Sequence, residues 1–172
     1  MVTIVIANTF KEYQKIADLA DLVWREHYTA IIGRDQVDYM LKSFQSATAI
    51  AQQVRDGYAY YFLNYNNKAV GYLAVKEEID ALFLSKVYVL SSYRGKKIGK
   101  AALQFVEEKA KHRQLKTIRL TVNKCNLEAI KAYKKLGFIN KGPLVKDIGQ
   151  GFIMDDYLME KPINLNAFRN NQ

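Results

Sequence analysis

The chain has 172 residues, of which 49% are hydrophobic and 25% charged, and its formal net charge at pH 7 is +9. This composition excludes intrinsic disorder, collagen-like sequence and low complexity, and the length fits one domain with a sizeable core. The single cysteine, Cys125, excludes an internal disulfide, a four-thiolate zinc site and a CxxC redox pair, and it favours a reducing, cytoplasmic setting. No apolar run approaches the roughly 20 residues of a membrane span, and the first residues lack the basic start of a signal peptide.

In the first half of the chain, the hydrophobic pattern predicts one strand, a group of helices and a hairpin. Apolar side chains at Ile16, Leu19 and Val23 recur at helical spacing, and β-branched residues mark the first strand. Asparagine tolerates left-handed backbone, so Asn66 and Asn67 predict a tight turn between two antiparallel strands. The predicted elements are strands at residues 3–7, 58–64 and 69–75, and helical regions at 10–27, 35–44 and 46–54.

In the second half, strands and helices alternate. Ile98, Ala102 and Phe105 fall on one helical face, and a later helix has Asn126 as its N-cap and Gly137 as its left-handed terminator. The predicted elements are strands at 82–90, 117–122, 138–141 and 152–160, and helices at 99–111 and 126–135.

The resulting order is β-α-α-β-β-β-α-β-α-β-β. It predicts an α/β (α+β) fold with a mixed, mostly antiparallel sheet of six to seven strands, flanked by helices. A right-handed crossover through the helix at 99–111 would make the strands at 82–90 and 117–122 parallel. We expect residues 1–163 to form a single domain and residues 164–172 a frayed polar tail.

The positive charge is concentrated in one segment. Residues 86–135 contain 14 basic and three acidic residues, whereas the rest of the chain has 12 basic and 14 acidic residues. A basic segment of this kind favours nucleic acid, an acidic membrane surface or a phosphorylated ligand as partner, and composition does not choose among them. The motifs within the segment must decide.

The first motif is Tyr93-Arg-Gly-Lys-Lys-Ile-Gly-Lys-Ala-Ala102, a basic turn with two glycines that leads from a strand into a helix. Glycine permits close approach of the backbone, and the first N–H groups of a helix are unpaired, so such a turn can bind phosphate. The spacing excludes a P-loop, and no GxGxxG is present, so neither ATP nor NAD is indicated. The alternative is a solvated basic helix start.

The second motif is Asn126-Leu-Glu-Ala-Ile-Lys-Ala-Tyr-Lys-Lys-Leu-Gly-Phe138. Asn126 and Tyr133 are seven residues apart and therefore share one face of a short helix that follows a strand. Tyr133 could point its phenol at a ligand along the sheet. The competing interpretation makes Tyr133 a core aromatic residue and Asn126 only a cap.

Together the two motifs resemble the GNAT superfamily of N-acetyltransferases, in which an Arg/Gln-x-x-Gly-x-Gly/Ala turn binds the pyrophosphate of acetyl-CoA. Arg94 and Gly99 fit the ends of that turn, and the second motif fits at five further positions: Asn126, Ala129, Tyr133, Gly137 and Phe138. The resemblance extends over roughly residues 2–161. Lys97 departs from it, because it stands where the family usually has its middle glycine, so the affinity for acetyl-CoA could differ.

The resemblance implies a set of acetyl-CoA-binding residues. The backbone of Val87, Tyr88 and Val89 would bind the pantetheine arm, and Asn123, Asn126 and Tyr133 would contact it farther along. The pyrophosphate would be bound by a run of seven residues: Arg94, Gly95, Lys96, Lys97, Ile98, Gly99 and Lys100.

The implied mechanism is direct transfer without a metal, in which a neutral amine attacks the thioester carbonyl. The N–H of Val89 would stabilise the oxyanion, and Tyr133 would be the general acid that protonates the thiolate of CoA. The general base is not assigned, since the strand before the turn has no carboxylate. Candidates are His27, Asp80, Asp155 and Asp156. An acyl-cysteine route through Cys125 lacks an identifiable histidine partner.

The acceptor is a small-molecule amine or a peptide. A diffuse resemblance to PaiA-type polyamine acetyltransferases rests on residues 24–28, Gly71-Tyr72 and residues 154–159. A cationic amine could be attracted by a set of acidic residues that are otherwise solvated surface: Glu77, Glu78, Asp80, Asp155 and Asp156. The alternatives are an acyl-CoA-binding protein without catalysis and a basic nucleic-acid-binding module. We expect neither a nucleic-acid nor a membrane partner, and the sequence does not distinguish a monomer from a homodimer.

Overall fold

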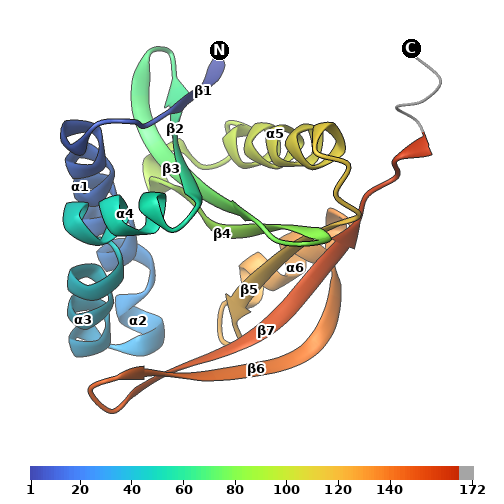
Figure 1. Cartoon of the computed structure of the whole chain (residues 1–172). Helices are drawn as coiled ribbons and strands as arrows, with labels where there is room; N and C mark the ends of the chain where they lie inside the picture. The colour runs from blue at the N-terminus through green and yellow to red at the C-terminus, as the bar shows by residue number, and fades with distance from the viewer. Residues whose placement is uncertain (167–172) are drawn as a thin grey trace. The chain divides into compact units, whose positions relative to one another are not determined.

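A computed structural model describes residues 1–166 of the chain and contains strands, α-helices and one 3₁₀ turn (Figure 1). The strands are β1 (Val2–Ile6), β2 (Tyr58–Tyr65), β3 (Lys68–Glu77), β4 (Ala81–Val89), β5 (Thr117–Asn123), β6 (Ile139–Gly149) and β7 (Phe152–Pro162). The helices are α1 (Phe10–His27), α2 (Thr29–Ile32), α3 (Arg34–Phe44), α4 (Ala47–Arg55), η1 (Ser91–Tyr93), α5 (Ile98–His112) and α6 (Leu127–Lys135).

The strands form one seven-stranded sheet in the order β1-β2-β3-β4-β5-β7-β6. β4 and β5 pair in parallel, whereas the β1–β2, β2–β3, β5–β7 and β6–β7 pairs are antiparallel. The predicted α/β fold with a mixed, mostly antiparallel sheet is therefore confirmed. The chain divides into two compact units, which are described separately below. The first comprises Met1–Lys76 with Ser85–Phe105, and the second comprises Glu77–Leu84 with the chain from Val106 on.

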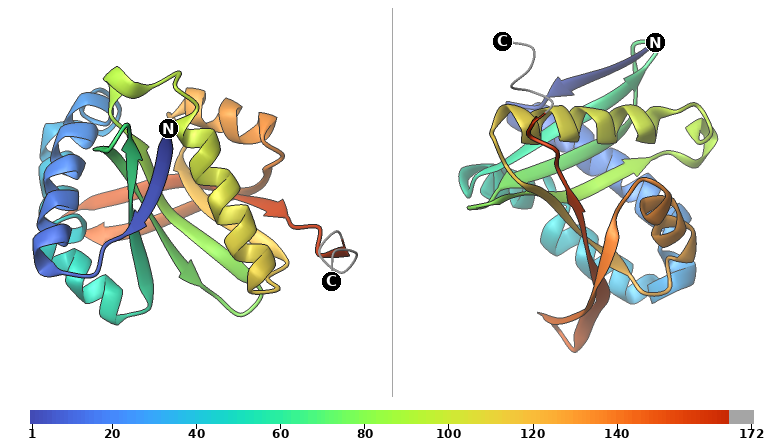
Figure 2. Two further views of the ribbon diagram at one scale, coloured as in Figure 1. Left: turned by 90° about the horizontal axis from the view of Figure 1, so that it is seen from above. Right: turned by 90° about the vertical axis from the view of Figure 1, so that its right-hand side faces the viewer.

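In the first unit, helices cover both faces of β2 and β3. Adjacent residues of a strand point to opposite faces, so Tyr60 turns toward α4, where its hydroxyl donates to Gln53, and Tyr61 packs against Phe105 of α5. The view from above shows α1 and α5 on opposite sides of these strands (Figure 2). The predicted turn is confirmed, because Asn66 and Asn67 both have positive φ, at 49° and 64°.

Between β1 and β2 the chain forms four helices, whereas three helical regions were predicted. The additional helix is the single turn α2, which ends at Gly33 with a φ of 83°, and the predicted start of α4 at Ser46 is confirmed, since the Ser46 Oγ accepts from the Ala49 N–H. α1 begins with a capping box in which Thr9 and Glu12 satisfy each other's backbone N–H groups. Local polar chemistry thus sets these boundaries.

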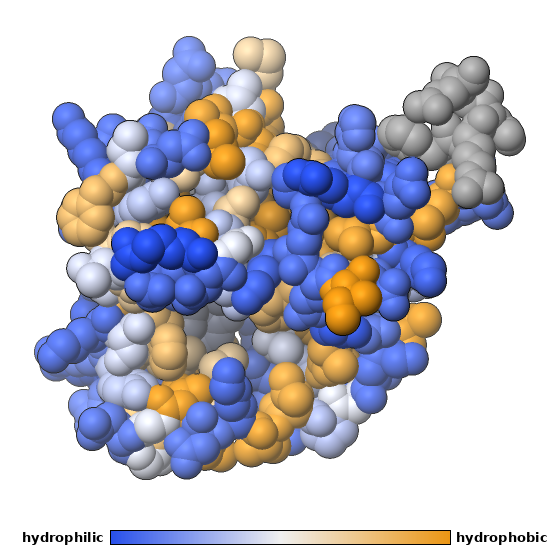
Figure 3. All heavy atoms as spheres, in the orientation of Figure 1, coloured by the Kyte–Doolittle hydropathy of each residue, from blue (hydrophilic) through white to orange (hydrophobic). Residues whose placement is uncertain are grey.

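In the second unit, β5 pairs with β7, and β7 pairs with β6 in a long hairpin. The predicted strand at 138–141 was too short, because β6 runs for 11 residues. Almost all of β6 is exposed, so it lacks the alternation of buried and exposed residues by which a strand is recognised. Apolar side chains at Leu144, Val145 and Ile153 reach the surface, and orange spheres lie where this hairpin runs (Figure 3).

Each unit has its own buried apolar side chains. Ile16, Ile50 and Leu63 are fully buried in the first unit, and Ile118 and Met159 are fully buried in the second. Within residues 1–166, no helix is long and apolar enough to cross a membrane. The predicted polar tail lies mostly outside the described residues, which end at residue 166.

Candidate functional site

Strand β4 has an edge that its neighbour does not use. The parallel pairing with β5 covers residues 81–83 only, so residues 84–89 have no ladder partner from β5 within the described part of the chain. On the other edge, β3 comes close at Gly71, where an added Cβ would lie 2.2 Å from the Tyr88 carbonyl oxygen. The backbone of Val87, Tyr88 and Val89 is therefore held from one side and available to a ligand on the other.

The predicted phosphate-binding turn follows directly. Gly95 and Lys97 have φ values of 78° and 61°, so the backbone reverses twice before α5 begins at Ile98. A Cβ added to Gly95 or Gly99 would meet nothing within 4 Å, so there is open space beside both glycines, at the helix end whose first N–H groups have no partner within the helix. Unpaired helix N–H groups beside open space and positive backbone dipoles suit a bound phosphate. This turn therefore fits the pyrophosphate of a CoA-type ligand.

Four basic side chains of the turn are exposed, and none of them takes part in the ion pairs found among residues 1–166. They are Arg94, Lys96, Lys97 and Lys100. Lys96 places its Nζ 5.5 Å from the centre of the Tyr65 ring. No carboxylate neutralises the turn in these recorded pairs, so its positive charge is available to an anionic ligand.

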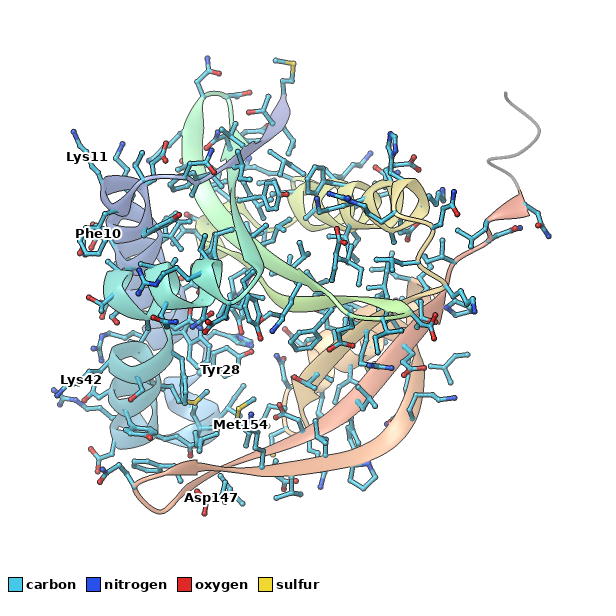
Figure 4. The ribbon with its side chains drawn as sticks, in the orientation of Figure 1. Phe10, Lys11, Tyr28, Lys42, Asp147 and Met154 are labelled. Atoms are coloured by element: carbon cyan, nitrogen blue, oxygen red, sulfur yellow. The ribbon has the colours of Figure 1, made fainter. Side chains whose placement is uncertain are left out.

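Aromatic side chains cluster around the ring of Tyr88 on β4. The Tyr88 ring lies 5.6 Å from Trp24, 6.0 Å from Tyr28 and 5.5 Å from Tyr72, measured between ring centres. The Tyr72 hydroxyl donates to the buried Gln45 side chain, and burial raises the pKa of Tyr72 well above its ordinary value. Tyr28 stands at the end of α1 (Figure 4). The sequence predicted a role only for the backbone of Tyr88. Because residues two apart in a strand share a face of the sheet, the spacing of Lys86 and Tyr88 could have indicated that the Tyr88 ring lies on the same face as Lys86.

Lys86 is a buried lysine that sequence reasoning counted only as part of the basic segment. Its Nζ donates to Gln53 at 3.1 Å and to Ser85 at 3.0 Å, and it lies above the rings of Tyr58 and Tyr60. Burial without a carboxylate partner lowers the pKa of Lys86 to about 7. Part of the predicted positive charge is thus inside the fold, where Lys86 is only about half protonated at pH 7.

A cavity of about 340 Å³ opens between α1 and α3, away from the predicted site residues. Asp21, Arg25 and Asp38 line it, and Arg25 bridges the two carboxylates. Because the carboxylates of Asp21 and Asp38 are already bridged by Arg25, this cavity gives no reason to move the candidate site.

The remaining predicted residues belong to the second unit. Asn123 closes β5, and its side chain accepts from the Cys125 N–H at 2.9 Å. Asn126 stands at the N-cap position of α6 but makes no side-chain capping bond, although it is buried. The half-buried Tyr133 ring packs edge-on against Phe138 at 5.5 Å, and Gly137 has the predicted left-handed φ, at 95°. Cys125 is exposed and free.

The acidic residues proposed to attract an amine are mostly engaged. Four of the five form ion pairs: Glu77 with Arg113, Glu78 with Arg119, Asp80 with Lys116, and Asp155 with Lys124. These ion pairs offset part of the negative charge that the four carboxylates would offer to an amine, and the attraction of an amine by this set stays a prediction. The fifth, Asp156, is buried and lies outside the recorded ion pairs of the described residues. The remaining base candidate, His27, packs its ring on Tyr28 at 4.8 Å.

Comparison with known proteins agrees with this geometry. A model of the acetyltransferase (GNAT) family matches residues 16–138. A search of curated proteins finds no match. Among solved structures, a PaiA N-acetyltransferase from Thermoplasma acidophilum in complex with coenzyme A is 20% identical, with a TM-score of 0.75 over 94% of this chain and 99% of that one.

Two further structures share the fold. A GCN5-related N-acetyltransferase from Rhodopseudomonas palustris is 14% identical, with a TM-score of 0.79 over 94% of this chain and 95% of its own. The ribosomal-protein-S18-alanine N-acetyltransferase of Escherichia coli is 21% identical, with a TM-score of 0.68 over 95% of each chain. Since the family model covers most of the sequence, including the basic turn at 94–100 and the Tyr133 helix, the chain belongs to the acetyltransferase (GNAT) family, whose members transfer acetyl groups from acetyl-CoA.

Proposed function

We propose that residues 1–163 act as one catalytic domain that moves an acetyl group directly from acetyl-CoA to a primary amine of a small molecule or a peptide. The observation that carries this proposal is the edge of β4 beyond residue 83, where the ladder with β5 stops within the described residues, followed at once by a basic turn with open space at Gly95 and Gly99. A polyamine is one candidate acceptor, since a PaiA N-acetyltransferase shares the fold. A peptide amine is another, since a ribosomal-protein-S18-alanine N-acetyltransferase shares it too.

Each predicted residue has a role in binding acetyl-CoA. The backbone groups of residues 87–89 bind the amides of the pantetheine arm as an added strand would, and residues 94–100 bind the pyrophosphate through backbone N–H groups and basic side chains. Asn123 and Asn126 contact the arm farther along. The buried Asn126 amide supports this role, because it is not used as a helix cap.

The reaction needs a nucleophile, an oxyanion donor and an acid. The amine nitrogen forms a bond to the thioester carbon, and the Val89 N–H stabilises the negative oxygen that results. The C–S bond then breaks, and the Tyr133 phenol donates its proton to the departing thiolate of CoA. The proton that leaves the amine goes to a base. The products are an amide and CoA.

Binding and turnover assays test the proposal. Calorimetry should give heat with acetyl-CoA and little with duplex DNA, and a panel of polyamines, amino-acid derivatives, aminoglycosides and peptides should identify an acceptor by release of free CoA. Tight DNA binding without acetyl-CoA heat would overturn the enzyme proposal. Acetyl-CoA heat without CoA release from any amine would favour acyl-CoA binding without transfer. Gel filtration over a range of concentrations would distinguish the monomer from the homodimer.

Substitution of Tyr133 tests the acid. We expect Tyr133→Phe to lower kcat by about 10²-fold, while the Kd for acetyl-CoA changes by less than about threefold, because the phenol donates its proton only as the thiolate leaves. Tyr39→Phe is the matched control, since this tyrosine packs on Phe44 in α3 and has no assigned role. Unchanged turnover in Tyr133→Phe would remove Tyr133 from the mechanism.

A further inference from the structure

The base that the mechanism lacks has one well-placed candidate, Asp156, on β7. In the antiparallel register of β5 and β7, Asp156 stands directly opposite Asn123, which is one of the proposed arm-binding residues. Side chains directly opposite in such a pair have their Cβ atoms roughly 5 Å apart and point to the same face. Asp156 therefore lies at the end of β5 where the chain turns toward α6 and Tyr133.

The surroundings of Asp156 differ from those of the other carboxylates near it. Only 5% of the residue is exposed, and its carboxylate accepts a hydrogen bond from the Thr121 hydroxyl on the same face of β5. The adjacent Asp155 points to the other face and forms an ion pair with Lys124. Asp156 is thus a desolvated carboxylate that is oriented by a hydroxyl and not neutralised by a direct cation.

The charged groups around Asp156 act in opposite directions. Burial is the largest effect, and it raises the pKa of Asp156, as does the negative charge of Asp155. The Thr121 hydrogen bond and the positive charge of Lys124 lower this pKa. The net result is a pKa of about 6. On β6 the residue opposite is Leu144, and the next on that face, Lys146, stands opposite Met154. Met154, which is labelled in Figure 4, lies on β7 two residues before Asp156.

We propose that Asp156 is the general base that accepts the proton of the attacking amine; this assignment rests on the proposed function. As the C–N bond forms, the nitrogen becomes positively charged, and its proton passes to a carboxylate oxygen of Asp156, directly or through one water. The thiolate takes a proton from Tyr133. Asp156 then releases its proton to solvent and the Tyr133 phenolate takes one from solvent, so that protons balance and both groups return to their starting state. A base of this strength is still mostly ionised at pH 7 yet accepts a proton more readily than an exposed carboxylate.

The assignment is tested with Asp156→Asn, which has the same shape and retains an oxygen for the Thr121 hydroxyl. We expect kcat/KM to fall by about 10²–10³-fold, and the acid limb of the wild-type pH profile, with an apparent pKa near 6, to disappear. Asp156→Glu should restore part of the rate. The Kd for acetyl-CoA should change by less than about threefold, and the thermal midpoint at pH 8 should not fall, because a buried charge has been removed.

The matched control is Asp155→Asn, which alters the neighbouring carboxylate on the same strand. It should keep its activity within a few fold and move the acid limb to lower pH, because a negative charge next to Asp156 has gone. Isotope-edited NMR of the Asp156 carboxyl provides a readout that needs no acceptor.

The outcomes distinguish a failure of the proposed acetyltransferase function from a failure of the Asp156 assignment. A carboxyl that titrates near 4 overturns the assignment, as does an Asp156→Asn variant with the wild-type rate and acid limb. If the wild-type protein releases no CoA with any amine, the proposed function fails and takes the assignment with it. If the wild-type and Asp156→Asn proteins release CoA equally, only the assignment fails.

Discussion

Lys97 adopts backbone angles that an L-residue with a side chain normally avoids. Its φ of 61° lies in the left-handed region, which glycine adopts without steric cost. The turn therefore accepts the steric cost of a Cβ, which for a left-handed residue is about 1–2 kcal/mol. The sequence indicated a departure from the motif, and only the backbone revealed that Lys97 takes a conformation that favours glycine.

Replacing Lys97 by glycine should relieve this strain. We expect Lys97→Gly to raise the free energy of unfolding in urea by about 0.5–1 kcal/mol, the steric relief being partly offset by the greater freedom of glycine in the unfolded chain. The matched control is Lys100→Gly, which removes the same side chain from a helical position of α5 and should lower stability by about 1 kcal/mol. Equal losses in the two variants would contradict the interpretation.

At the scale of elements, the geometry of β4 depends on its neighbour β3. β3 can approach the backbone of residues 88 and 89 only because Gly71 has no side chain, and the Leu90 N–H donates to the Val70 carbonyl at 2.9 Å just beyond. The proposed arm-binding edge is therefore positioned by a contact 17 residues away in sequence. No periodicity in the sequence predicts a contact of this kind.

Gly71→Ala should disturb this strand pair. A methyl group 2.2 Å from the Tyr88 oxygen forces β3 and β4 apart, so we expect a loss of about 1–3 kcal/mol in unfolding free energy and weaker acetyl-CoA binding in calorimetry. Gly99→Ala makes the same change in a helical position with open space around it, and it should leave stability unchanged or raise it by up to about 1 kcal/mol. A stable Gly71→Ala protein with wild-type affinity would show that the close approach is dispensable.

At the scale of the whole molecule, the net charge of +9 is distributed in three ways. Lys86 is buried, and the basic residues of the turn at 94–100 are exposed outside the recorded ion pairs. Farther along the chain, six basic residues form ion pairs with carboxylates: Lys111, Arg113, Lys116, Arg119, Lys124 and Lys161. Within the basic segment, the side chains of the proposed phosphate-binding turn share this exposed state outside the ion pairs of the described residues with Lys131, Lys134 and Lys135 of α6.

Two buried ionisable groups, Lys86 and Asp156, give the stability of the fold a pH dependence below about pH 10. The pKa of Lys86 drops from 10.5 in the unfolded chain to about 7, so between these values the unfolded chain binds more protons and stability rises with pH, by up to about 1.4 kcal/mol per pH unit. The pKa of Asp156 is raised from 3.8 to about 6, so between these values the folded chain binds more protons and stability falls as pH rises. These two groups alone place a minimum of stability near pH 6–7.

Urea unfolding between pH 7 and 10 measures the contribution of Lys86. We expect Lys86→Met to be more stable than the wild type at pH 7 and to lack much of the alkaline rise, because the buried amine no longer has to lose its proton. Lys11→Met, at an exposed lysine of α1 (Figure 4), should keep that rise. An unchanged slope in Lys86→Met would show that this lysine stays protonated inside the fold.

The sequence by itself determined the fold class, the order of the strands along the chain, the hairpin turn at Asn66 and the family, because these depend on local periodicity, turn chemistry and motif spacing. It also predicted the helix boundary at Ser46 and the glycines of the proposed phosphate-binding turn. It did not predict the short helix α2 or the length of β6, because a single helical turn and an exposed strand leave no hydrophobic pattern.

Only the tertiary structure separated the acidic residues. Glu77, Glu78, Asp80 and Asp155 have the same charge as Asp156, yet long-range ion pairs occupy those four, whereas Asp156 is buried beside Thr121. The same holds for Lys86, whose burial removes it from the exposed charge. Protonation and availability depend on desolvation and on partners far away in the chain, and these are set by packing, so the spacing of residues in the sequence does not specify them.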